Sequence, residues 1–336
     1  MQRYFQVPGS LEKSIDLNLE KYFGISLMDS KKLAESVKKL SDYFIANPEG
    51  STPWKEPWAQ IAYLVYFMPL NHARVQAVVT EARGNGFFES LDHVVDFGAG
   101  FGTASLALAD DFKNFKLVER AKDICSKYSF LPPGANVTWS DKIDQVENPK
   151  SCLSVFSYSL TEIEEIPAWA KKSEALMILE PSTQQDGRLL MSLRQRLIDD
   201  GYSLWAPCTQ QGLCPLLTQS KTDWCHDRIL FTMPKWFEQI EQNLPMKNRT
   251  LTFSYLLARR TPAPQRDSRI ARTVGDRMKE KGKDRQLVCR SEAREFLAWL
   301  HKSGIDQEIP RGVLINIPEA SQKVSNEIRI SEKIST

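Results

Sequence analysis

The sequence lacks a dominant charge and a long hydrophobic run. Its 336 residues contain 44 Lys and Arg against 42 Asp and Glu, so the formal net charge is only +2. A helix needs about 18 or more consecutive apolar residues to cross a membrane. The longest apolar run, residues 58–70, has only about a dozen such residues and is interrupted by Gln60. The sequence therefore excludes a membrane-spanning helix, and no membrane partner is expected.

Export signals are also missing. The first residues carry Glu12, Asp16 and Glu20 and show neither a signal-peptide pattern nor an Arg-rich transit segment, which favours a cytoplasmic protein. The six cysteines of such a chain are not expected to form a disulfide framework, and metal binding is the favoured use where they cluster. Cys125 and Cys152 lie in a region of predicted strands, so we interpret them as ordinary buried thiols.

Two periodic patterns divide the chain. Apolar residues recur at helical spacing over residues 10–85, which predicts helices there. Trp54, Trp58 and residues 61–69 form an aromatic-rich stretch, and such a stripe is more often core than a ligand-binding surface. Strands and helices alternate over residues 93–207, which predicts a parallel sheet with helices on both faces.

A strand, a glycine-rich turn and a helix follow one another over residues 93–109. Glycines in the turn permit positive φ and a close approach to a ligand, and the start of the helix presents unpaired N–H groups. The spacing is G-x-G-x-G, whereas a dinucleotide site has G-x-G-x-x-G. The acidic residue before the first glycine would repel a phosphate and suits a ligand with an amino group and a sulfonium. The turn resembles the first motif of class I S-adenosylmethionine-dependent methyltransferases. The residues expected to contact the cofactor here are Asp96, Gly98, Ala99, Gly100 and Gly102.

Acidic residues end the next two predicted strands. Glu119 follows Asp96 by 23 residues, close to the offset of about 20 at which a carboxylate binds ribose hydroxyls in such units. Asp141 ends the third strand, where it can meet an adenine amino group. The alternative is a glycine turn in an unrelated α/β protein. The glycine turn, followed in order by Glu119 and by Asp141, favours a binding site for S-adenosylmethionine.

Two further polar residues fall at strand ends. Ser159 follows the fourth strand and Glu180 ends the fifth. Ligands of such sheets bind outside the carboxyl ends of the strands, so both residues are expected near the cofactor cleft. A simple strand-end cap is an equally good interpretation of either one.

Three cysteines fall within a short segment, and a fourth follows at a distance. Cys208 and Cys214 are flanked by prolines and turn residues, Cys225 comes shortly after, and 63 residues separate Cys225 from Cys289. Four soft thiolates suit a tetrahedral zinc ion or an iron–sulfur cluster, and the absence of a C-x-x-C pair favours the cluster. Unliganded core cysteines are the alternative. Three interpretations of His226 stay open: a metal ligand in place of one cysteine, a hydrogen-bond donor to a ligand, or a surface residue.

These motifs together resemble the methyltransferase-like family associated with the mitochondrial small ribosomal subunit, which also has bacterial members. The resemblance runs from about Trp54 to Cys289 and rests on residues 96–102, 159–162, 180–181, 206–208, 214–215 and 224–226. It implies a class I methyltransferase fold, a four-cysteine [4Fe-4S] cluster, and a role in assembly or translation on the small subunit. The matched cysteine positions are Cys208, Cys214 and Cys225, and Cys289 is taken as the fourth ligand because it is the only cysteine downstream of Cys225. Ser182 departs from the family, which usually has glycine after Glu-Pro, and the tail beyond Cys289 does not match clearly.

Basic residues concentrate in one segment. Residues 259–285 contain ten Lys or Arg against four acids, a net +6, so the remaining chain carries 2 − 6 = −4. The segment is either an RNA-binding stretch or a solvated linker between the first three cysteines and Cys289. With the resemblance, RNA and proteins of the small ribosomal subunit become the expected partners, and the protein is expected to be a monomer off the ribosome.

The predicted fold class is α/β, a Rossmann-like methyltransferase sheet with helices before it and a Cys-rich metal-binding extension after it. The predicted parts are a helical domain (1–88), the S-adenosylmethionine-binding domain (89–205), a Cys-rich region (206–317) and a polar, frayed tail (318–336).

Catalytic residues are not identifiable. Methyl transfer needs mainly in-line positioning of a nucleophile, so no triad is required and none is present. An Asn-Pro-Pro-Tyr loop, which would mark an amine methylator, is missing after the fourth strand. Two hypotheses stay open: an iron–sulfur or zinc-containing methyltransferase with RNA as the favoured substrate, and a non-catalytic assembly factor that uses the fold only for recognition.

Overall fold

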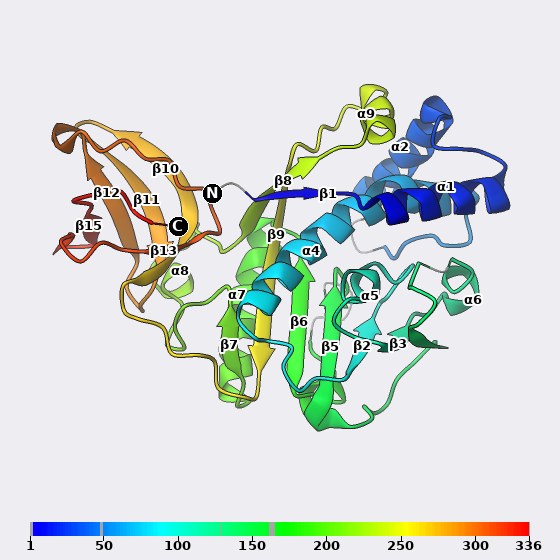
Figure 1. The fold of residues 1–336 in the computed structure, drawn as a ribbon, viewed down its shortest axis with the longest axis horizontal. Helices are drawn as coiled ribbons and strands as arrows, with labels where there is room; N and C mark the ends of the chain where they lie inside the picture. The colour runs from blue at the N-terminus through cyan, green and yellow to red at the C-terminus, as the bar shows by residue number, and fades with distance from the viewer. Residues whose placement is uncertain (1–2, 48–49, 129, 161–164, 336) are drawn as a thin grey trace.

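Two sheets organise the chain: a large mixed sheet in the middle and a small C-terminal one (Figure 1). The structure is a computed structural model that describes residues 3–47, 50–128, 130–160 and 165–335. The strands of the large sheet are β1 (Tyr4–Gln6), β2 (His93–Phe97), β3 (Asn114–Val118), β4 (Asn136–Ser140), β5 (Cys152–Ser157), β6 (Ala175–Glu180), β7 (Ser203–Ala206), β8 (Asp227–Thr232) and β9 (Thr250–Arg259). Those of the small sheet are β10 (Ile270–Glu280), β11 (Lys283–Cys289), β12 (Glu295–Leu300), β13 (Leu314–Asn316), β14 (Gln322–Val324) and β15 (Glu327–Arg329).

The large sheet has the strand order of a class I methyltransferase. Five parallel strands run in the order β4-β3-β2-β5-β6, and β9 joins β6 in the antiparallel direction. The other edge of β9 pairs with β8 along its first half and with β7 along its second. The predicted strands of residues 93–180 are therefore confirmed. The parallel sheet predicted for residues 93–207 is confirmed for these five strands, and β9, from outside that range, joins β6 antiparallel and makes the whole sheet mixed.

Helices cover both faces of the large sheet, as the alternation of its core residues requires. Val94 packs on the face that carries the N-terminal helices, and its neighbour Val95 packs on the opposite face. Likewise, Met177 packs on the face that carries the N-terminal helices, and its neighbour Ile178 packs on the opposite face. The helices are α1 (Gly9–Phe23), α2 (Ser30–Ala46), α3 (Pro57–Ala62), the π-helix η1 (Tyr63–Phe67), α4 (Met68–Gly84), α5 (Thr103–Ala107), α6 (Lys122–Cys125), α7 (Gln184–Asp199), α8 (Pro215–Thr218) and α9 (Lys235–Gln242). In the described part of the chain, no helix has the length and apolarity to cross a membrane.

The N-terminal helices share one core with the sheet. Leu11, Ile15 and Leu19 line one face of α1 at helical spacing and are buried in the same cluster as Val94. The helices predicted for residues 10–85 are therefore confirmed. The preceding segment also contributes β1, which pairs in parallel with β8 at the edge of the sheet.

The small sheet curls into a C-terminal barrel. Its strand order is β13-β10-β11-β12-β15-β14, with β12 and β15 parallel. Among the described residues its two end strands, β13 and β14, do not pair with each other, so the barrel is open at this edge. Its interior holds Trp299 and three isoleucines of the last segment, Ile328, Ile330 and Ile334. The interpretation of residues 318–336 as a frayed polar tail is therefore wrong, because their apolar side chains complete this core.

The structure also corrects the expected boundary of the Cys-rich region. Strands β8 and β9 lie within residues 206–317 but belong to the large sheet, and the barrel begins only at β10. The basic segment, residues 259–285, is neither a linker nor a loop, because it contains β10 and the first part of β11. Several of its cations are consequently held in ion pairs, including Arg259 with Glu174.

Arg272 of β10 joins the barrel to the rest of the molecule. Its side chain is only 2% exposed. Its Nε donates to the carbonyl of Pro207 (2.7 Å), Nη1 to the carbonyl of Gly312 (2.6 Å) and Nη2 to Oε1 of Glu81 on α4 (2.6 Å). Burial alone would raise the pKa of Glu81, but the nearby guanidinium outweighs it and holds that pKa below the ordinary value.

We predict that Arg272→Met destabilises the protein by about 3–5 kcal/mol, because it leaves a buried carboxylate and two carbonyls without their donor. The unfolding midpoint in denaturant measures the effect. Arg269→Met is the matched control, since the Arg269 side chain is 42% exposed, and it should change stability by less than about 0.5 kcal/mol. Equal effects of the two substitutions would contradict the assigned role of Arg272.

Candidate functional site

The glycine turn lies at the carboxyl end of β2, where ligands of parallel sheets bind. Gly98, Gly100 and Gly102 all have positive φ, at 69°, 52° and 76°. A Cβ at Gly98 would lie 2.7 Å from Cβ of Ser159, and one at Gly102 would lie 2.9 Å from Cδ2 of Leu117. A side chain at either position would therefore clash with the protein's own residues, so both positions require glycine. At Gly100 the nearest atom would be 3.4 Å away. Gly100 is itself buried, and the atoms nearest to this Cβ position belong to Trp54 and Tyr63.

Glu119 lies beside this turn, as the sequence predicts. It follows β3, which is the neighbour of β2 in the sheet. Its Oε2 accepts a hydrogen bond from the N–H of Gly100 (3.1 Å), and its Oε1 accepts one from the N–H of Ala121 (3.0 Å). The two bonds fix the carboxylate at the carboxyl edge of the sheet, where it can accept hydrogen bonds from ribose hydroxyls.

Asp96 is buried beneath the turn, with 1% of its surface exposed. Its Oδ2 accepts hydrogen bonds from the backbone N–H (3.1 Å) and the hydroxyl (2.7 Å) of Ser105 on α5. Burial raises the pKa of Asp96 to about 6, although the bonds from Ser105 oppose the rise. The carboxylate thus accepts hydrogen bonds from two donors of Ser105, in the first turn of the short helix α5. Its expected contact with a ligand amino group stays a prediction.

The remaining predicted residues lie along the same edge of the sheet. Asp141 follows β4 and is exposed, 3.5 Å from Nζ of Lys122. Ser159 is 5% exposed and lies against Gly98. Oε1 of Glu180 accepts a hydrogen bond from the N–H of Leu160 (3.0 Å), which ties the ends of β5 and β6 together. Two residues of the motif 159–162, residues 161 and 162, lie outside the described residues.

Two aromatic side chains that the sequence assigned to the core also reach the turn. Trp54 and Tyr63 are partly exposed, and their nearest atoms would lie 3.4 Å and 3.5 Å from a Cβ at Gly100. Neither residue was among the predicted site residues, because their helical spacing is typical of a packed face. The only local signal is their position in a stretch unusually rich in aromatic residues.

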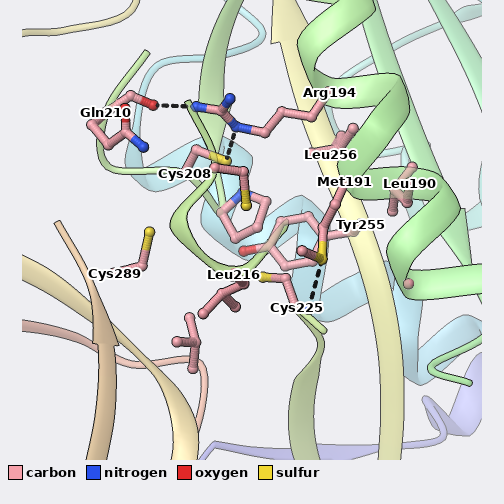
Figure 2. A pocket seen from close by; sticks show the side chains of 14 residues that line it. Leu190, Met191, Arg194, Cys208, Gln210, Leu216, Cys225, Tyr255, Leu256 and Cys289 are labelled. Atoms are coloured by element: carbon pink, nitrogen blue, oxygen red, sulfur yellow. Dashed lines mark hydrogen bonds between the residues drawn. The ribbon is translucent and has the colours of Figure 1, made fainter. Parts of the chain in front are cut away.

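The four predicted cysteines line one pocket between α7, α8 and the barrel (Figure 2). Cys208 follows β7, Cys214 precedes α8, Cys225 precedes β8 and Cys289 ends β11. They come together because the outer face of the barrel packs on α7 and α8 through an apolar cluster. The central members of that cluster are Met191, Leu216, Val274, Leu287 and Phe296.

A buried guanidinium faces this pocket. Nε of Arg194 donates to Sγ of Cys208 (3.2 Å), and its Nη2 donates to the carbonyl of Gln210 (2.9 Å) (Figure 2). Arg194 is only 1% exposed. Burial raises the pKa of Cys289 to about 12, with a further contribution from the thiol of Cys208, so a positive charge nearby is needed to hold these groups as thiolates. Arg194 was not predicted, since nothing in its helical context distinguishes it.

No three or more His, Cys, Asp or Glu side chains within residues 3–47, 50–128, 130–160 and 165–335 are arranged to hold a metal ion as they stand. The four thiols nevertheless line one pocket whose other walls are largely apolar. His226 does not line it. Its ring instead stacks on Trp224 at 5.1 Å, and burial lowers its pKa to about 4. Cys125 and Cys152 are buried elsewhere, as expected.

The raised pKa of Asp96 yields a pH-dependence prediction. Because the folded-state pKa, about 6, exceeds the ordinary value of 3.8, the folded protein binds the proton more tightly than the unfolded chain. This stabilisation is complete below pH 3.8 and is lost as pH rises through about 6. Relative to Asp96→Asn, the wild type should therefore lose about 2 kcal/mol of unfolding free energy between pH 4 and 7, measured in denaturant. Parallel pH profiles of the two proteins would contradict this.

Known structures show distant similarities to the chain. A protein from Pyrococcus horikoshii, described as a candidate RNA methyltransferase, has 14% sequence identity and a TM-score of 0.34, with 68% of this chain and 97% of that chain covered. Magnesium protoporphyrin IX methyltransferase from Synechocystis with bound S-adenosylmethionine has 14% identity and a TM-score of 0.34, with 67% and 97% covered. TrmK from M. capricolum, in complex with S-adenosylhomocysteine, has 11% identity and a TM-score of 0.28, with 54% and 69% covered.

Among sequences, no curated protein matches the chain. One family model does match, and it is described as mitochondrial small ribosomal subunit Rsm22. The match covers residues 57–296, from α3 through the four cysteines to the first strands of the barrel. Because this match spans well over half of the chain, the protein belongs to the Rsm22 family.

Proposed function

We propose that the protein binds S-adenosylmethionine at the glycine turn and acts as a methyltransferase on the small ribosomal subunit, with RNA as the favoured substrate. The observation that carries the proposal is the hydrogen bond from Gly100 to Glu119 at the carboxyl edge of a sheet with the class I methyltransferase strand order. A glycine turn with a carboxylate hydrogen-bonded to its backbone suits a ligand with a ribose and no phosphate.

In this proposal each predicted site residue has an assigned role. The backbone at Gly100 lies against the ligand, Glu119 accepts hydrogen bonds from the ribose hydroxyls, and Asp141 meets the adenine amino group. Ser159 and Glu180 shape the ends of β5 and β6, where the methyl acceptor enters. When bound, S-adenosylmethionine supplies an activated methyl group. The protein contributes chiefly positioning, which can itself account for several kcal/mol of the barrier.

An RNA partner is supported by the architecture of the barrel. The order β10-β11-β12-β15-β14 with β12 and β15 parallel is that of OB-type barrels, in which the sheet face and the first hairpin loop bind oligonucleotides. Here Leu287 and Phe296 place the sheet face against the cysteine pocket. The β10–β11 hairpin stays exposed and presents Lys279 and Lys281, which makes it the favoured RNA contact.

We further propose that Cys208, Cys214, Cys225 and Cys289 hold a [4Fe-4S] cluster, with zinc as the alternative. Four soft donors in one largely apolar pocket support a thiolate-bound metal centre. The N–H···S bond from Arg194 supports it further, because a cluster of thiolates is negative and needs a nearby positive charge in a buried site. The cluster would tie the barrel to α7 and α8.

The cofactor proposal predicts that Glu119→Ala weakens S-adenosylmethionine binding by about tenfold to hundredfold, because hydrogen bonds to a charged acceptor are worth about 1.5–3 kcal/mol. Isothermal titration measures the loss. Glu319→Ala is the matched control, since this carboxylate is 91% exposed and lies outside the proposed cofactor site, and its loss should leave binding unchanged. Unchanged binding by Glu119→Ala would place the cofactor elsewhere.

Cells that carry only Glu119→Ala separate catalysis from assembly. A base modification missing from small-subunit RNA in these cells, with normal subunit profiles, supports the enzyme. Defective subunits with all modifications present support the non-catalytic assembly factor instead. Both readouts come from the same RNA preparation, so the two outcomes are distinguishable.

The cluster proposal predicts that Cys208→Ser and Cys225→Ser lose iron and sulfide together, because each removes one of four ligands. Protein purified without oxygen should absorb broadly near about 400 nm, and iron and acid-labile sulfide should be measured on it. Cys125→Ser and Cys152→Ser are matched controls and should keep both. Stoichiometric zinc without iron would replace the cluster by zinc, and a metal-free wild type would remove both assignments.

A further inference from the structure

The aromatic side chains of the N-terminal helices form a wall over the glycine turn. Trp54 precedes α3, and Tyr63 begins the π-helix η1. The Cβ position at Gly100 lies 3.4 Å from Cζ2 of Trp54 and 3.5 Å from the hydroxyl of Tyr63. This distance is ordinary van der Waals contact. The two partly exposed side chains therefore pack directly on the backbone of the turn at Gly100, which is itself buried.

Neighbouring rings hold this wall in place. The ring centroids of Trp54 and Tyr63 are 4.9 Å apart, and each ring also packs on Phe101, at 4.7 Å and 5.3 Å. Phe101 is 1% exposed and lies within the turn itself, so it links the wall to the glycines. Rigid aromatic surface beside a ligand loses little conformational entropy on binding.

The π-helix gives the wall a further sign of function. A π-turn inserts a residue into the helical register, is costly, and occurs frequently at functional sites. Here it covers Tyr63–Phe67 and interrupts an otherwise continuous helical segment from α3 to α4. Burial raises the pKa of Tyr63 to about 12, so its phenol stays neutral at physiological pH. The wall consequently presents neutral π surface and carries no ionised group of its own.

We propose that Trp54 and Tyr63 recognise the positive charge of the sulfonium through cation–π attraction, and so make the site selective for S-adenosylmethionine over its neutral product. This inference rests on the proposed binding of S-adenosylmethionine at Gly100 and Glu119. Aromatic faces attract cations within about 6 Å of the ring, and the attraction grows when water is excluded. S-adenosylhomocysteine has a neutral thioether at the same place and gains nothing from this attraction.

Isothermal titration of the whole protein with three probes tests the proposal. The probes are S-adenosylmethionine, S-adenosylhomocysteine and sinefungin, which carries an ammonium in place of the methylated sulfonium. Trp54→Leu should weaken both charged probes by about threefold to thirtyfold and leave S-adenosylhomocysteine within about twofold. Trp54→Phe keeps an aromatic face and should retain most of the selectivity.

Trp58→Leu is the matched control. Trp58 belongs to the same stretch, but its ring packs near Tyr43 (6.2 Å) and Nζ of Lys39 (4.7 Å) and is not among the nearest neighbours of Gly100. It should bind all three probes like the wild type. Circular dichroism of each variant verifies folding, and Tyr63→Leu provides a second, independent loss of one ring.

The outcomes are separable. Equal losses for charged and neutral probes in Trp54→Leu and Tyr63→Leu would reduce the wall to a steric boundary and overturn the charge recognition. Unchanged binding of all probes would show that the rings serve only as core. A wild type that binds none of the three would overturn the proposed cofactor site and this inference together, whereas a selective wild type with unselective variants supports both.

Discussion

A buried guanidinium joins three separate parts of the molecule. Arg272 contacts helix α4 through Glu81, the segment before Cys208 through Pro207, and the last part of the barrel through Gly312. Removing such a charge from water costs several kcal/mol, which is recovered only when all of its partners are in place. The barrel, the cysteine segment and the helix that covers the sheet therefore have one relative position in which this charge is satisfied.

That position creates the cysteine pocket. Cys289 is carried on the last residue of β11, and the other three thiols come from loops around α8 and β8. The hydroxyl of Thr209 donates to the carbonyl of Cys289 (3.0 Å), and Arg294 pairs with Asp223 (2.6 Å), so polar contacts surround the apolar centre of the interface. A metal centre at these four thiols would act as a second clamp on the same interface, and its loss would loosen the barrel that presents the basic hairpin.

The glycine turn is built by a different constraint. Parallel strands end at one edge, so β2 and β3 bring Gly100 and Glu119 together with little help from the rest of the chain. The ring pair of Trp54 and Tyr63, from the N-terminal helices, packs on this turn at Gly100. The N-terminal helices thus contribute both to the core and to the candidate cofactor site, which explains why they share a hydrophobic cluster with the sheet.

The sequence by itself determined the strands over residues 93–180, the glycine turn and the carboxylate of Glu119 beside it, because these features arise from local periodicity and from neighbouring strands. It also identified the four cysteines as a set, through family resemblance. Only the tertiary structure decided that Arg272 is buried, since its partner Glu81 is 191 positions away in the chain. The same holds for the tail, which looks polar until β15 pairs in parallel with β12 and buries Ile328. Burial of a charge or of a short apolar segment depends on partners that are distant in sequence, and no local pattern records them.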